Sequence, residues 1–72
     1  MYFVVEIQKP KDGQYASIIS HHATREEAES KYYNVLSYAA ASELEVHGAY
    51  LFDIYNLIDH KVYDRQQYAV ED

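Results

Sequence analysis

Four histidines are the residues of this chain whose chemistry could support a metal site. His21 and His22 are adjacent, so on a regular strand they point to opposite faces and cannot both bind one ion. A site that joins one of them to His47 or His60 and a carboxylate such as Asp59 is conceivable, but the spacing typical of zinc ligands is missing. We therefore expect no metal and no other cofactor.

Glu6 is the carboxylate within the apolar run of residues 2–8. Surrounded by tyrosines, it is a candidate for a general base. Acid–base catalysis needs two groups in a cleft with different pKa values, and a small single-layer sheet offers little concavity. The chain has no cysteine and two glycines, which leaves no cysteine nucleophile and little material for a phosphate-binding loop. We expect that the protein is not an enzyme.

Nine tyrosines among 72 residues are the compositional outlier. Tyrosine offers a rigid apolar ring and a hydroxyl, which favours protein interfaces. Tyr2, Tyr50 and Tyr63 could instead stack the bases of a single strand, but such sites combine stacking with a cationic groove. Twelve acidic residues against six basic ones give a formal charge of −6, so direct nucleic-acid binding is disfavoured.

Two acidic clusters, Glu26/Glu27/Glu29 and Glu43/Glu45, could imitate the phosphates of DNA and block a nucleic-acid-binding protein. The first cluster is also explained by the positive end of a helix dipole. Mimicry of DNA by the two acidic clusters therefore stays an alternative.

Four runs of β-branched and aromatic residues predict strands over residues 2–8, 15–22, 46–53 and 57–64. The segment from Lys9 to Gly13 contains Pro and Asp-Gly and predicts the turn of a first hairpin. Asn56 is expected to close the second hairpin in the left-handed conformation.

A helix is predicted to begin at Thr24, which forms a capping box with Glu27, and to run to about Ser42. Its apolar stripe consists of Ala28, Tyr32, Val35, Leu36 and Ala39.

These elements predict an α+β fold with the order ββαββ, in which a four-stranded antiparallel sheet of strand order 2-1-3-4 carries one helix on one face. Residues 1–65 form one domain, and residues 66–72 are expected to be a flexible tail. No apolar run approaches the roughly 20 residues of a membrane span, and the chain opens without the basic stretch of a signal peptide. We expect a cytoplasmic protein.

One helix cannot bury both faces of this sheet, and both faces look apolar in sequence. The uncovered face is therefore expected to meet a second copy or a different protein. Phe3, Val5 and Ile7 are wholly apolar and are assigned to the helix side. Val4→Asp is therefore expected to disrupt self-association or partner binding and to damage the fold less than Val5→Asp does. The predicted interface residues are Tyr2, Val4, Glu6, Tyr50, Tyr55 and Tyr63.

The segments YFVVEIQ, DGQYASII, TREEAESKYYNVL and EVHGAYL resemble small uncharacterised proteins encoded by phages and prophages of gut Firmicutes. This chain departs from them at Ile54-Tyr55-Asn56, where the group has a more polar, glycine-containing turn. The resemblance implies a phage origin and carries no catalytic residue. The uncovered sheet face leads us to expect a homodimer. By analogy with small acidic phage proteins, we expect it to inhibit or modulate a host protein, including one of antiviral defence. The alternative is a small ligand-binding or metal-binding dimeric protein.

Overall fold

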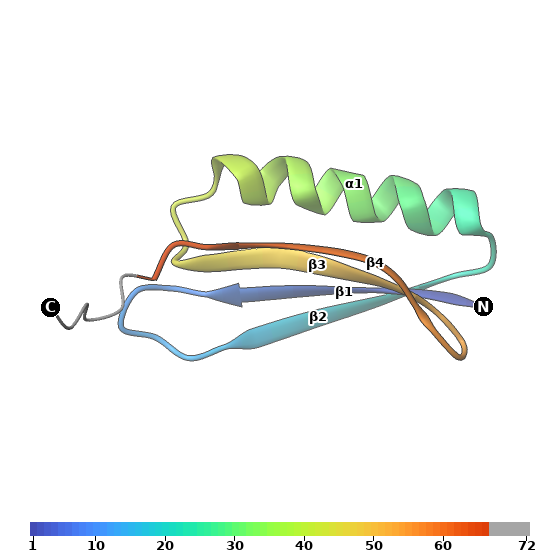
Figure 1. Cartoon of the computed structure of the whole chain (residues 1–72), viewed down its shortest axis with the longest axis horizontal. Coiled ribbons are helices and arrows are strands. Elements are labelled where there is room, and N and C mark those ends of the chain that lie inside the picture. Colours follow the sequence, from blue (N-terminus) through green and yellow to red (C-terminus); the bar gives the residue numbers. More distant parts are fainter. Residues whose placement is uncertain (67–72) are drawn as a thin grey trace, which may run out of the picture.

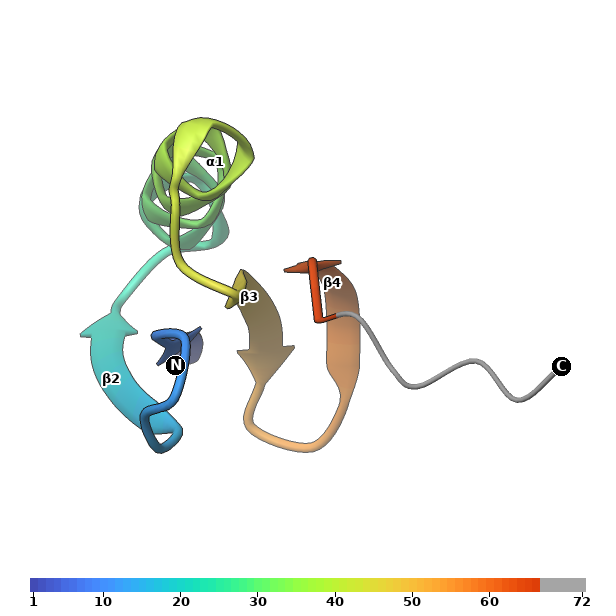
Figure 2. The ribbon, with the colours of Figure 1, turned by 90° about the vertical axis from the view of Figure 1, so that its left-hand side faces the viewer.

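The computed structural model describes residues 1–66 and has five elements, shown in Figure 1. They are β1 (Tyr2–Lys9), β2 (Ala16–His22), α1 (Arg25–Ala41), β3 (Val46–Asp53) and β4 (Leu57–Asp64). The strands form an antiparallel sheet of order β2-β1-β3-β4, and α1 lies across one face of it (Figures 1 and 2). The predicted fold class and strand order are confirmed. Residues 67–72 of the predicted tail lie outside the described residues.

The two hairpins are closed by aspartates. In the first, Gly13 N donates to Pro10 O at 3.1 Å, and Asp12 has a φ of 62°. In the second, Asp53 Oδ1 accepts hydrogen bonds from the backbone N–H groups of Tyr55 (2.7 Å) and Asn56 (2.6 Å), which lower the pKa of Asp53. The predicted left-handed Asn56 is wrong, because the Asp53 carboxylate holds the turn without it.

Both ends of α1 are capped by side chains. At its start, Thr24 Oγ1 accepts from Glu27 N at 3.2 Å, which is one of the two hydrogen bonds of the predicted capping box. Its last turn has no basic residue of its own, and the guanidinium of Arg65, just after β4, donates to the carbonyls of Ala39 (2.9 Å) and Ala40 (3.2 Å). The Arg65 guanidinium thus provides hydrogen bonds to carbonyls at the negative end of the helix dipole.

Thr24→Ala is expected to cost about 1 kcal/mol, because the N–H of Glu27 loses its acceptor. The thermal midpoint should fall by roughly 4–8 °C, measured by circular dichroism. Ser30→Ala, at an exposed position of the same helix, is the control and should leave the midpoint unchanged or raise it. An unchanged midpoint for Thr24→Ala would contradict the capping role.

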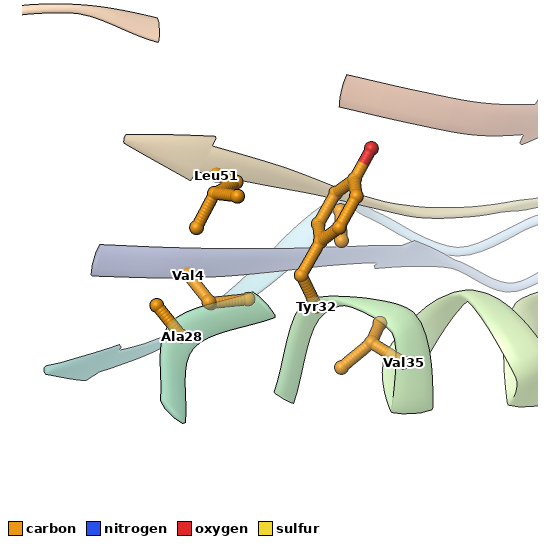
Figure 3. Close-up of a cluster of buried hydrophobic side chains, with 6 residues drawn as sticks. Val4, Ala28, Tyr32, Val35 and Leu51 are labelled. Atoms are coloured by element: carbon orange, nitrogen blue, oxygen red, sulfur yellow. The ribbon is translucent and has the colours of Figure 1, made fainter. Parts of the chain in front are cut away.

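The core lies between α1 and the sheet, and its buried members are Val4, Ala28, Tyr32, Val35, Ala49 and Leu51. Tyr32 points from α1 towards the sheet in Figure 3 and is 1% exposed. This burial raises the pKa of the Tyr32 phenol to about 12. The bulky ring belongs to the same cluster as Ala49, whose methyl group leaves room for it.

The position of Val4 in this core reverses the predicted assignment of the two sheet faces. Tyr2, Val4 and Glu6 share the side of β1 that faces α1, whereas Phe3, Val5 and Ile7 lie on the side that α1 does not cover. The prediction that the wholly apolar row packs under the helix is therefore wrong.

Candidate protein-binding face

The side of the sheet that α1 leaves uncovered is here called the open face. Residues paired across antiparallel strands share a side, and this register places on the open face Phe3, Val5, Ile7, Lys9, Ser17, Ile19, His21, Val46, Gly48, Tyr50, Phe52, His60, Val62 and Asp64. Two of these residues are charged, Lys9 and Asp64, and both lie at one end of the sheet, where they pair with Val46. None of the other twelve is an Asp, Glu, Lys or Arg, although the chain carries a formal charge of −6. The open face is thus a mainly apolar surface on an acidic protein, and its charged strand residues are confined to one end.

Aromatic side chains on the open face contact one another in two groups. Tyr50 stacks on Phe52 within β3, with ring centroids 6.2 Å apart, and on His60 of β4, with centroids 5.6 Å apart. On the other side of the sheet centre, Phe3 of β1 meets His21 of β2 edge to face at 5.1 Å. Contacts between rings restrict the rotation of these side chains.

A groove of about 400 Å³ crosses one end of the open face. Its floor is formed by strand residues, among them Phe3, Val5 and Ile19, and its wall by residues 53–56 of the second hairpin. In Figure 1 this hairpin curls away from α1, towards the open side. Tyr55 at its tip is 89% exposed, which is high for an aromatic side chain.

The structure separates the predicted interface residues into two groups. Tyr50 and Tyr55 lie on the open face and at its groove. The remaining four, Tyr2, Val4, Glu6 and Tyr63, lie on the helix side. Tyr63 is placed there by its pairing with His47, and the cations of Lys61 and Arg65 lie 5.3 Å from its ring.

A polar pair on the helix side was missed by the sequence analysis. His47 Nε2 lies 2.7 Å from Glu6 Oε2, and Gln8 Nε2 donates to the same oxygen at 2.9 Å. Burial acts to raise the pKa of Glu6, but these hydrogen bonds, with positive charge at His47 and Lys31, outweigh it and leave the pKa lowered. His47 is 6% exposed, and its Nδ1 is buried without a hydrogen-bond partner among the described residues.

The Glu6–His47 pair has the chemistry of a general base, but its position does not suit that role. Neither residue lines the groove on the open face. A second groove, of about 480 Å³, is lined by Lys11, Glu43, Leu44, Glu45 and Arg65 and also excludes the pair. A substrate in either groove would therefore not contact the carboxylate or the imidazole.

Residues 1–66 were also compared with what a metal site and a membrane span require of a chain. No group of three or more His, Asp or Glu side chains within this part of the chain is arranged to hold a metal ion. No helix within it is long and apolar enough to cross a membrane. Comparison with models of protein families, with curated proteins and with solved structures finds no match for the chain.

Proposed function

We propose that this chain is a non-catalytic protein-binding module that forms a homodimer and uses the open face to bind and modulate another protein. The resemblance to phage-encoded proteins suggests a host protein in the bacterial cytoplasm as the target. The observation that carries the proposal is the open face itself, a mainly apolar and aromatic surface, charged only at one end of its strands, that no element of residues 1–66 covers.

The composition of the open face supports contact with protein. Interface centres are enriched in aromatic residues and depleted of charged ones, as this face is. Four strands about 4.8 Å apart, each some 25 Å long, give the face a footprint of roughly 500 Å². A patch of this size is comparable with the largest apolar patches of soluble monomers, which are often functional.

The groove beside Tyr55 favours a second candidate function, the binding of a small apolar ligand between strands and hairpin. Native mass spectrometry of the purified protein distinguishes ligand binding from protein binding. A bound small molecule that is lost in Val5→Asp would favour the ligand, whereas a ligand-free protein would favour the protein target.

The proposal is tested by affinity capture from a lysate of a gut Firmicutes bacterium. Wild type and Tyr38→Asp, changed at a 69% exposed position on α1, should capture the same protein. Val5→Asp, changed on the open face, should lose it while remaining folded. Capture that Val5→Asp leaves unaffected would contradict the open face as the binding surface.

A further inference from the structure

The outer edge of β2 has no neighbouring strand in the described part of the chain. On its inner side β2 pairs with β1 in an unbroken register of seven residue pairs, from Tyr2↔His22 to Gln8↔Ala16. In the strand order β2-β1-β3-β4 its other side is the end of the sheet, as Figure 2 shows. A regular edge strand presents unpaired N–H and C=O groups to which another strand can add.

Soluble proteins protect such edges with charges, prolines or bulges, and the two edges of this sheet differ in that respect. The β4 edge carries Asp59 and Lys61 and has a register shift opposite Leu51 and Phe52. The β2 sequence ASIISHH has no charged residue, no proline and no register shift. Ile18 and Ile19, on opposite faces of β2, are 54% and 58% exposed. The β2 edge is therefore open to pairing.

We propose that two copies of this chain join through their β2 strands, antiparallel about a two-fold axis at Ile19, into one continuous eight-stranded sheet. Ile19 is the middle residue of Ala16–His22, so this register pairs the strand over its whole length. Ala16 of each copy faces His22 of the other, and Ser17 faces His21. The inference rests on the proposed function, because it names where the second copy binds.

Charge favours a second copy at this edge. Two chains of formal charge −6 repel each other, and their approach is least unfavourable where neither carries a charge. The β2 strand meets that condition over all seven residues. A strongly basic partner would instead be drawn to the acidic surfaces elsewhere on the chain.

Contact area favours the same arrangement. The two-fold axis stands perpendicular to the sheet, so the open faces of both copies lie on the same side. A single face of roughly 500 Å² is smaller than the about 800 Å² that each partner contributes to a standard interface. Two faces side by side offer about 1,000 Å², which is sufficient for the stable binding of a target.

The absence of cysteine from the chain permits a direct test with single-cysteine variants. Directly opposed residues of an antiparallel pair have Cα atoms about 4.5–5.5 Å apart, within the range of a disulfide. Oxidised Ile19→Cys is therefore expected to form a disulfide-linked dimer on a non-reducing gel. Tyr33→Cys, equally 58% exposed but on α1, is the control and should remain monomeric.

Sedimentation velocity of the wild type and of two lysine variants provides the second measurement, that of the oligomeric state. Wild type should sediment as a dimer, and Tyr33→Lys should too. Ile19→Lys, which opposes two ammonium groups at the axis, should sediment as a monomer. A monomeric wild type, or Ile19→Cys that crosslinks no better than Tyr33→Cys, would overturn the inference.

The outcomes also separate this inference from the proposed function. Sheets packed face to face lie about 10 Å apart, too far for a disulfide between opposed strands. A wild-type dimer that Val5→Asp dissociates and that Ile19→Cys does not crosslink would overturn edge pairing and leave the open face as a contact surface. A crosslinked Ile19→Cys dimer with no capture that depends on Val5 would establish edge pairing and refute the target-binding role.

Discussion

Val4→Asp is expected to unfold the protein. Val4 is 1% exposed and belongs to the cluster between α1 and the sheet, so a carboxylate there would be buried without a partner. Burial of an unpaired charge costs several kcal/mol, and a domain of this size has a stability of roughly 4–10 kcal/mol in total. Far-UV circular dichroism should show loss of the native spectrum, and the cooperative thermal transition should disappear.

Val5→Asp is the matched control, because it makes the same change one residue later on the opposite side of β1. Val5 is half-buried at the groove of the open face, where a carboxylate can reach water. We expect a loss of about 1 kcal/mol and an intact thermal transition. The reverse result, a folded Val4→Asp and an unfolded Val5→Asp, would show that α1 covers the other face.

The elements of the fold were predictable because their signals are local. Thr24 and Glu27 lie three residues apart and mark the start of α1 by themselves. The strands follow from short runs of β-branched and aromatic residues, and their order follows from the short connections between them. Such signals need no knowledge of distant parts of the chain.

The assignment of the two faces was not predictable in the same way, because it depends on contacts between distant residues. Glu6 was predicted to be an interface residue, because its partner His47 is 41 positions away and the sequence does not reveal the pair. The small Ala49 opposite Glu6 marks the side with room for Tyr32, a signal visible only once the strand register is known. The cap from Arg65 to Ala39 spans 26 positions and was missed for the same reason.

Glu6→Gln is expected to lower the free energy of unfolding by roughly 2 kcal/mol at neutral pH, since it weakens charge-assisted hydrogen bonds in a nearly buried site. His47 Nε2 and Gln8 Nε2 both meet Glu6 Oε2, whose side chain is 14% exposed. Urea unfolding followed by tyrosine fluorescence measures the loss. Glu29→Gln is the control and should change the stability far less, because the Arg25–Glu29 pair is exposed and water screens its charges.

The effect of Glu6→Gln should also depend on pH. The folded protein holds the pKa of Glu6 below its ordinary value of 4.5, so in the wild type the carboxylate stabilises the fold fully above that value. This stabilisation is lost as the pH falls through the lower pKa of the folded state. The stability difference between wild type and Glu6→Gln should therefore narrow below pH 4.5. A difference that stays constant into acid would show that the ionised form of Glu6 contributes nothing to stability.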